Sequence, residues 1–178
     1  PTCLSVQAWR VSASGKTTLS NLLYNYWVEH IPGHKIELLD GDMFRTLNAY
    51  KFDYSSKERS QGLNVAIAVA YYLRKNNIIS ILASMLFAQK HRQYVRKILP
   101  GVIDIYCNAS LETCIKRDPK DVYKNNISKT VPQLVGVDIS FEVPDAPMIE
   151  LNTNDISVED SLNSLIHQLI ELKVIKTH

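Results

Sequence analysis

One stretch constrains this chain more than any other: Ser12-Ala13-Ser14-Gly15-Lys16-Thr17-Thr18. An apolar segment, Cys3 to Trp9, leads into it, and a helical pattern begins near Lys16. A strand, a loop of small residues and a helix that opens with Gly-Lys-Thr are typical of a phosphate-binding loop. In such a loop, consecutive backbone N–H groups and the helix N-terminus surround a phosphate chain and attract its charge.

The side chains of this loop predict a nucleotide and a metal ion. The Lys16 ammonium can reach the β and γ phosphates of ATP, and the Thr17 hydroxyl can bind Mg²⁺. Arg10 stands where the usual pattern has its first Gly, and a non-Gly residue held at positive φ costs on the order of 1–3 kcal/mol. The alternative is a surface Lys-Thr pair after a helix cap, but the strand-to-helix junction favours the phosphate loop.

Length and composition bound the class of protein. The 178 residues predict one domain over 1–178, and 46% hydrophobic with 21% charged residues is ordinary for a soluble globular protein. A net charge of +2 predicts no nucleic-acid partner. The three cysteines are odd in number and lack C-x-x-C spacing, and we see no signal peptide, so we expect a reducing cytoplasm. The longest apolar run, 78–83, is too short to span a bilayer, so we expect no membrane partner.

The first half of the chain alternates helices and strands. A helix after the loop has one apolar face, and residues 36–39 form a short strand that ends in Asp40-Gly41-Asp42. Carboxylates just past a strand lie where open α/β sheets bind ligands, although one of these aspartates could instead cap a helix over 43–47. The expected buried face consists of Leu19, Leu22, Leu23, Tyr26 and Trp27.

The middle of the chain continues this alternation. Ser55 and Glu58 form a capping box that opens a helix, and strands are expected at 78–83 and 102–107 with a basic helix, 90–99, between them. Strands alternating with helices predict an α/β fold with a doubly wound, mostly parallel sheet flanked by helices. The apolar stripe of the helix after Glu58 consists of Leu63, Ala66, Ile67, Ala70 and Leu73.

The last third begins with a short helix from Ser110 to Arg117. The polar, basic segment 117–124 contains Pro119 and predicts a mobile loop that can close over a nucleotide, unless its charges are merely solvated. Residues 131–147 are irregular, and 148–151 is a last candidate strand. Ser157 caps a final helix whose expected core-facing residues are Val158, Leu162, Leu165, Ile166, Leu169 and Ile170.

The strand ends separate kinases from other phosphate-loop proteins. Switch GTPases and many ATPases place a Mg²⁺-binding Asp at the end of a central strand, whereas the strands 78–83 and 102–107 are followed here by Ser84 and Asn108. The chain also lacks an Asn-Lys-x-Asp guanine-binding motif. An acidic residue at the 36–39 strand end can accept the proton of an acceptor hydroxyl, which suits a small-molecule kinase.

Five segments then resemble the adenylylsulfate (APS) kinase family across nearly the whole chain. That family phosphorylates the ribose 3′-hydroxyl of adenosine 5′-phosphosulfate with MgATP. The resemblance implies a P-loop kinase with a small mobile lid at about 117–135, a small-molecule nucleotide acceptor and a homodimer. The segments are Ser12–Leu19, Leu39-Asp40-Gly41-Asp42-x-x-Arg45, Tyr54-Ser55-x-x-Glu58-Arg59, Arg117-Asp118-Pro119-Lys120-x-x-Tyr123-Lys124 and Gly136-Val137-Asp138…Glu142-Val143-Pro144.

The resemblance also implies roles for single residues. Asp42 is the candidate base, and Lys16 acts with it in catalysis. Arg45 and Arg59 would bind the phosphate groups of the acceptor, and Tyr54 matches a Phe that stacks on its base. The ATP-binding set is Ser12, Ala13, Ser14, Gly15, Lys16, Thr17, Thr18, Arg117 and Lys120, with Thr17 on the metal. The acceptor set is Asp40, Arg45, Tyr54, Arg59, Met85, Lys124 and Leu134.

The acceptor side departs from the family pattern while the ATP side is largely kept. Met43 and Gly62 replace asparagines, Leu86-Phe87-Ala88-Gln89 replaces Ser-Pro-Tyr-Arg, and Leu134 replaces a second base-stacking Phe. A smaller base would fit, so cytidine diphosphoramidate, a nucleotide used in capsular sugar modification, is slightly favoured over adenosine 5′-phosphosulfate. The alternative to an active kinase is a non-catalytic nucleotide-binding module, in view of Arg10 and the altered acceptor site.

Overall fold

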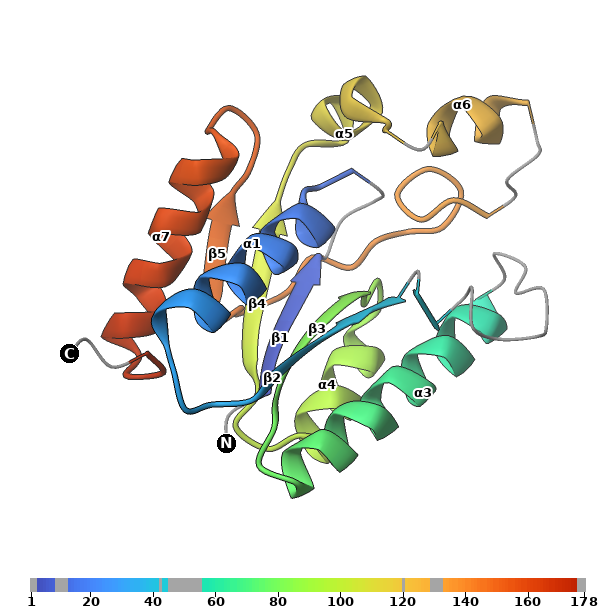
Figure 1. Ribbon diagram of the computed structural model, residues 1–178. Coiled ribbons are helices and arrows are strands. Elements are labelled where there is room, and N and C mark those ends of the chain that lie inside the picture. Colours follow the sequence, from blue (N-terminus) through green and yellow to red (C-terminus); the bar gives the residue numbers. More distant parts are fainter. Residues whose placement is uncertain are drawn as a thin grey trace.

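The computed structural model describes residues 3–8, 13–41, 43–44, 56–119, 121–128 and 133–175. Across this part of the chain, five parallel strands form one sheet in the order β2-β3-β1-β4-β5 (Figure 1). The predicted doubly wound parallel sheet is therefore confirmed. The strands are β1 (Cys3–Ala8), β2 (Ile36–Asp40), β3 (Ile79–Met85), β4 (Ile103–Asn108) and β5 (Ile149–Asn152).

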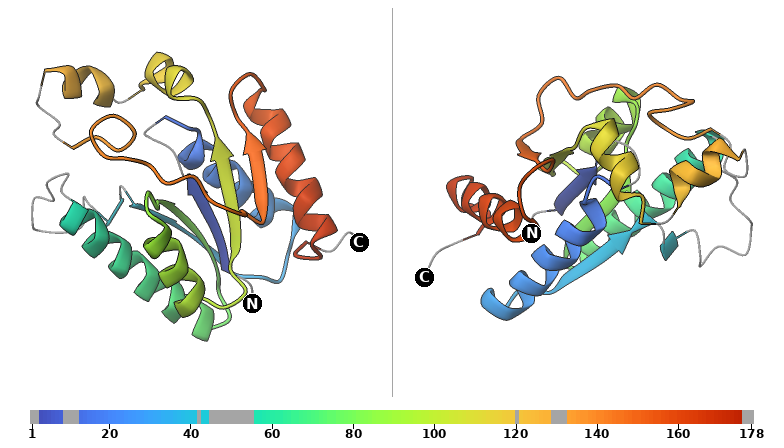
Figure 2. Two further views of the ribbon diagram at one scale, coloured as in Figure 1. Left: turned by 180° about the vertical axis from the view of Figure 1, so that it is seen from behind. Right: turned by 90° about the horizontal axis from the view of Figure 1, so that it is seen from above.

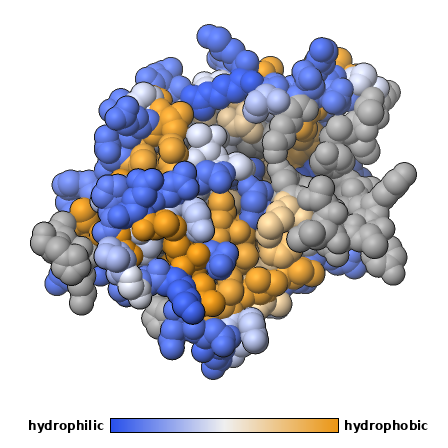
Figure 3. All heavy atoms as spheres, in the orientation of Figure 1, coloured by the Kyte–Doolittle hydropathy of each residue, from blue (hydrophilic) through white to orange (hydrophobic). Residues whose placement is uncertain are grey.

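Helices cover both faces of the sheet. Helices α1 (Lys16–His30) and α7 (Val158–Glu171) pack on one face, and α3 (Ser56–Lys75) and α4 (Gln89–Ile98) pack on the other (Figures 1 and 2). The short helices α5 (Leu111–Arg117) and α6 (Val122–Ile127) lie beyond the carboxyl ends of the strands. Thr18, Asn21 and Asn25 of α1 are exposed, and Figure 3 shows a hydrophilic stripe over this part of the molecule. None of the helices in the described ranges is long and apolar enough to cross a membrane.

The two faces of the sheet carry separate apolar cores because side chains alternate along a strand. In β3, Ile79 and Ile81 join the core under α1 and α7, whereas Leu82 joins the core under α3 and α4. The predicted faces of both long helices are buried in these cores. The buried members are Leu19, Leu23 and Trp27 in α1 and Leu63, Ala66, Ile67 and Ala70 in α3, whereas the predicted Leu22, Tyr26 and Leu73 are half-buried.

Two details differ from the sequence-based expectations. Residues 122–124 were expected in a loop, but they begin α6 because the Asp118 carboxylate accepts hydrogen bonds from the N–H groups of Val122 and Tyr123 at 2.8 and 3.0 Å. Val158 was expected in the core, but it lies in the first turn of α7 and is 50% exposed. The predicted cap of that helix is confirmed, since Ser157 Oγ accepts a hydrogen bond from the N–H of Asp160 at 3.0 Å.

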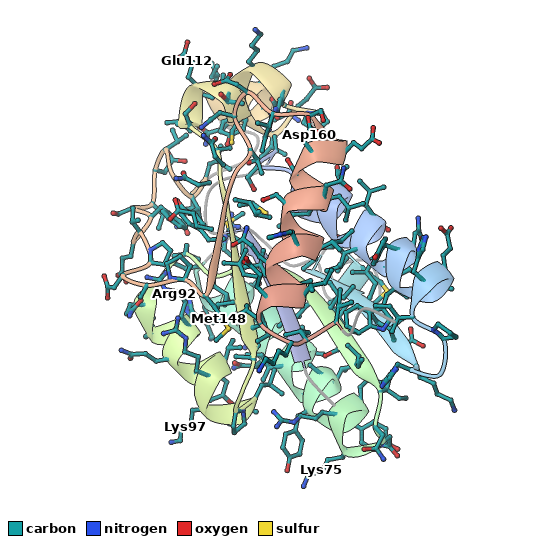
Figure 4. The ribbon with its side chains drawn as sticks, turned by 90° about the vertical axis from the view of Figure 1, so that its left-hand side faces the viewer. Lys75, Arg92, Lys97, Glu112, Met148 and Asp160 are labelled. Atoms are coloured by element: carbon teal, nitrogen blue, oxygen red, sulfur yellow. The ribbon has the colours of Figure 1, made fainter. Side chains whose placement is uncertain are left out.

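Residues 133–148, which precede β5 and form no helix or strand, are hydrogen-bonded to the start of α4. Glu142 donates its N–H to the Phe87 carbonyl at 3.0 Å, and its carboxylate accepts the N–H of Gln89, the first residue of α4, at 2.5 Å. Buried Arg92 completes the junction by donating to the side-chain oxygen of Gln89 at 2.7 Å and to the Leu86 carbonyl at 3.1 Å. Figure 4 shows Arg92 on α4 beside this segment. A distant glutamate therefore caps α4, whose own N-cap residue supplies no side-chain bond.

A histidine joins α3 to α4 at the same corner. His91 Nε2 lies 3.3 Å from the Ser60 hydroxyl, and the His91 ring meets Phe87 edge-on at 4.8 Å between centroids. The side chain is 8% exposed. Burial, followed by the charges of Lys90 and Arg92, lowers the pKa of His91, while Glu142 opposes the shift.

We expect His91→Gln to reduce the loss of stability in mild acid. The folded-state pKa of His91 lies below its ordinary value of about 6.5, so the unfolded chain takes up the proton first as the pH falls. Urea unfolding at about pH 7.5 and 5.5 should show a smaller decrease in unfolding free energy for the variant than for the wild-type protein. His167→Gln removes an exposed histidine of α7 as the control. Equal pH dependence in all three proteins would contradict the prediction.

Candidate nucleotide-binding site

The loop between β1 and α1 has the backbone shape of an anion site. Ala13 and Gly15 both adopt positive φ, at 71° and 94°, and flank Ser14. Gly15 is the N-cap residue of α1 and forms no side-chain cap, and the first turn of α1 contains no acidic residue. The first N–H groups of the helix therefore face a position that suits an anion through both hydrogen bonding and the helix dipole.

Lys16 follows this turn as the first residue of α1. Burial raises the pKa of the Cys107 thiol to about 12, and the positive charge of Lys16 partly opposes that shift. The ammonium is therefore near the carboxyl end of β4, to which Cys107 belongs. Thr17 is half-buried and Thr18 is exposed on the same turn. This places the predicted phosphate-binding residues together at the carboxyl edge of the sheet.

A pocket of about 270 Å³ opens directly beside the loop. Arg117, at the end of α5, forms part of its wall, and its guanidinium donates to the carbonyls of Thr153 and Asn154 at 2.7 and 2.9 Å. Arg117 was predicted to bind ATP together with the phosphate loop, and it lines the same pocket as the loop residues Ala13, Gly15 and Thr18. Its lining residues are Ala13, Gly15, Thr18, Leu19, Arg117, Pro119, Thr153, Ile156, Val158 and Ser161.

The predicted acceptor residues are described in part. Arg59, in the first turns of α3, donates to the Gln133 carbonyl at 3.2 Å, so it lies next to Leu134. Met85, at the end of β3, packs against the cluster that contains Val135. Asp40 ends β2, which pairs with β3. These residues come from three elements and belong to the carboxyl side of the sheet.

Two acceptor residues occupy unexpected surroundings. Leu134 is 1% exposed and packs with Ala109, Cys114 and Tyr123, in a cluster against which Ala13 of the phosphate loop also packs. Its side chain therefore joins the lid to the loop. Lys124 is exposed on α6 with its ammonium 4.0 Å from Asp121. Burial raises the pKa of the neighbouring Tyr123, which keeps that phenol protonated within the cluster.

Several predicted residues lie outside the described ranges. They are Ser12, Asp42, Arg45, Tyr54 and Lys120, together with the loop departure Arg10. Their assignments stay predictions that rest on the sequence.

The described side chains fit Mg²⁺ held mainly by a nucleotide. Magnesium prefers oxygen ligands and in kinases takes few of them from the protein, the rest being phosphates and water. The Thr17 hydroxyl supplies such an oxygen at the loop, and Asp40 supplies a carboxylate at the neighbouring edge of the sheet. In the described part of the chain, no three His, Cys, Asp or Glu side chains gather as a metal site of their own.

Sequence reasoning missed the far wall of the pocket, namely Thr153, Ile156, Val158 and Ser161. A signal for it existed, because Thr153 directly follows the carboxyl end of the last strand. Residues at that position of a parallel sheet lie along the same edge as the phosphate loop.

The parallel sheet has a loop with the backbone shape of a phosphate site at its centre, and a pocket adjoins that loop. These features define the class of P-loop nucleotide-binding proteins. The comparisons with known proteins narrow the class. The family model of adenylylsulphate kinase matches residues 5–152, and the chain belongs to this family. It is an ATP-dependent kinase, a phosphotransferase that uses ATP with Mg²⁺ and acts on an alcohol group.

Named relatives cover most of the chain. The probable adenylyl-sulfate kinase of Archaeoglobus fulgidus is 34% identical over 143 residues, which are 80% of this chain and 91% of that protein. The adenylyl-sulfate kinase of Marinobacter nauticus is 32% identical over 170 residues, covering 94% and 84% of the two chains. The APS kinase CysC of Mycobacterium tuberculosis, solved with AMPPNP and APS, superposes with a TM-score of 0.82 over 95% of this chain and 96% of its own. At 24% identity, that last comparison supports the fold.

We expect Lys16→Ala to lower turnover at least about a hundredfold while leaving the fold intact, because it removes the charge placed to stabilise the transferring phosphoryl group. ADP release from MgATP, measured with a panel of nucleotide acceptors, gives the rate. Lys97→Ala, at the exposed end of α4 remote from the loop, is the control. Turnover of Lys16→Ala within tenfold of wild type would exclude the phosphate-loop assignment.

Proposed function

We propose that this kinase transfers the γ-phosphate of ATP to the ribose 3′-hydroxyl of a nucleoside 5′-diphosphate-like acceptor. The observation that carries the donor half is the pocket that continues from Gly15 and Thr18 to Arg117 and Thr153. It offers apolar and polar walls for a base, and it adjoins the N-terminus of α1, where a phosphate chain can bind. The acceptor half rests on the family and on the residues named below.

On the donor side, each residue has a distinct role. The N–H groups of the loop 12–18 bind the phosphate chain, and Lys16 neutralises charge as the γ-phosphate is transferred. One guanidinium nitrogen of Arg117 is held by the carbonyls of Thr153 and Asn154, and a planar guanidinium stacks well on an aromatic base. Thr17 would hold Mg²⁺ together with the phosphates, and the ion would supply further neutralisation of charge. Lys120 of the lid would add a positive charge beside the nucleotide.

On the acceptor side, Asp42 accepts the proton of the ribose hydroxyl, and Asp40 supports the same strand end. Arg45 and Arg59 bind the phosphate-type groups through charge-assisted bonds. Tyr54 stacks on the base, and Met85, Leu134 and Lys124 complete the site from β3 and the lid. The bond between Arg59 and the Gln133 carbonyl supports this grouping, because it holds an acceptor arginine against the lid segment.

The acceptor base is the finer part of the proposal, and cytosine is favoured over adenine. Leu134 stands where the family pattern has an aromatic ring, and its side chain packs among lid residues. Losing one aromatic partner removes on the order of 0.5–1.5 kcal/mol of stacking, which weakens the selection of a large purine. Cytidine diphosphoramidate is therefore the first candidate. Adenosine 5′-phosphosulfate is the second, because the named relatives are adenylyl-sulfate kinases.

Two further features belong to the same proposal. The chain acts as a single nucleotide kinase domain over 1–178 with a lid at about 117–135 that closes over the nucleotides. It functions as a homodimer, which sedimentation of the purified protein tests directly.

We expect Asp42→Asn to lower kcat by about 10²–10⁴-fold with a much smaller effect on the affinity for ATP, because the amide cannot accept the hydroxyl proton. Initial rates at saturating MgATP and acceptor give kcat. Calorimetry with ADP measures nucleotide affinity separately. Asp40→Asn is the paired variant. A larger loss in Asp40→Asn than in Asp42→Asn would reverse the assignment of the base.

The acceptor is identified by comparing kcat/KM for cytidine diphosphoramidate and adenosine 5′-phosphosulfate at the same MgATP concentration. We expect the cytidine compound to be the better substrate, with 3′-phosphorylation located by phosphorus NMR of the product. A ratio of a hundred or more in favour of adenosine 5′-phosphosulfate would overturn the pyrimidine preference. ADP binding without transfer to any nucleotide in the panel would support the non-catalytic module instead.

A further inference from the structure

Thr153 connects the last strand to the phosphate loop. It is the residue after β5, and its N–H donates to the Asn108 carbonyl at the end of β4 at 2.9 Å. Its hydroxyl donates to the Ser14 carbonyl at 3.0 Å across 139 positions of sequence. Thr153 is 7% exposed and Ser14 is 1% exposed, so this hydrogen bond is shielded from water. Its loss would leave a buried carbonyl without that partner, which is costly.

The bond fixes the orientation of a particular peptide group. The carbonyl of Ser14 and the N–H of Gly15 belong to one peptide plane, and in a trans peptide they point in opposite directions. No cis peptide occurs in the described part of the chain. Because the Thr153 hydroxyl binds the Ser14 carbonyl, the Gly15 N–H of the same peptide points away from Thr153.

The residues on either side of this peptide have an uncommon backbone conformation. Ala13 and Gly15 both have positive φ, and a non-Gly residue in that region persists only where its surroundings stabilise it. The Ser14 hydroxyl is buried and has no hydrogen-bond partner among the described residues. The Thr153 hydroxyl restrains the Ser14–Gly15 peptide from outside the loop, through its hydrogen bond to the Ser14 carbonyl.

The same residue is joined to the lid. The Thr153 carbonyl accepts a hydrogen bond from Arg117 at 2.7 Å, and Arg117 ends α5 just before the segment that leads to α6. Arg117, Thr153 and Gly15 line one pocket. Thr153 therefore stands between the lid and the loop peptide.

We propose that Thr153 is a positioning residue of this kinase, whose hydroxyl aims the Gly15 N–H at the phosphates of the donor nucleotide. The inference rests on the proposed role of the loop 12–18 as the ATP site. It assigns a function to a residue that contributes no charge and no proton to the reaction. The energetic effect is that of a prearranged donor, which needs no reorientation when the phosphates bind.

The test compares Thr153→Val, which keeps the branched shape without the hydroxyl, with Thr153→Ser, which keeps the hydroxyl. We expect the valine variant to bind MgADP about tenfold more weakly by calorimetry, as for the loss of about one hydrogen bond, and the serine variant to stay within about twofold of wild type. Thr113→Val, which removes a hydroxyl bonded to Ser110 at the start of α5, is the matched control and should bind MgADP normally.

A spectroscopic measurement separates positioning from general destabilisation. In nitrogen-15-labelled protein, the amide signal of Gly15 should shift between wild type and Thr153→Val without nucleotide and should return in Thr153→Ser. An unchanged Gly15 signal, or equal ADP affinity in wild type and Thr153→Val, would overturn the inference. So would equal impairment of the serine and valine variants. Failure of the wild-type protein to bind MgADP would instead refute the proposed ATP site.

Discussion

Parallel pairing of β1 with both β3 and β4 puts the loop after β1 at the middle of the sheet's carboxyl edge. Every strand of a parallel sheet ends at that edge, so residues far apart in sequence become neighbours of the loop. Asp40 is the last residue of β2, Met85 is the last residue of β3, and Thr153 directly follows β5. The site depends on this arrangement, because the loop alone supplies N–H groups but no pocket and no acceptor contacts.

The proposed donor and acceptor sides, and the segments beside them, are stabilised in different ways. On the donor side, short hydrogen bonds to backbone carbonyls, from Thr153 and Arg117, fix the loop and the pocket wall. On the acceptor side, Glu142 and Arg92 fasten an otherwise irregular segment to the start of α4. Arg92 is buried, so its charge is compensated by hydrogen bonds and by the nearby charges of Glu142 and Asp145. A buried cation costs free energy unless it is paired in this way, so the segment and α4 have a strongly preferred arrangement.

Local patterns in the sequence predicted the elements well, and long-range contacts account for what they missed. Helix periodicity identified the buried faces of α1 and α3, because those faces follow from residue spacing alone. The helix α6 was missed because a carboxylate placed before a proline, Asp118, caps it. Val158 matched the apolar period of α7, yet it lies at the pocket, since the first turn of a helix need not cover the sheet. The position of Thr153 after the last strand could have been recognised, but its hydrogen bond to Ser14 could not be predicted, because the two residues lie 139 positions apart.

Under the proposed function, the placement of Leu134 would link the lid to selectivity for the acceptor. A side chain in this position contacts Ala13 of the phosphate loop through the same cluster that contains Tyr123 of α6. Any movement of α6 therefore changes the packing beside the loop, and any ligand that reorders residues 133–135 also moves the carbonyl that Arg59 binds. An aromatic ring at this position would have to pack against Tyr123 of α6 and also stack on the base of the acceptor. Leucine is compact enough to be buried entirely in the cluster with Ala109, Cys114 and Tyr123. In the proposed complex, the acceptor base would then be held mainly by residues other than Leu134.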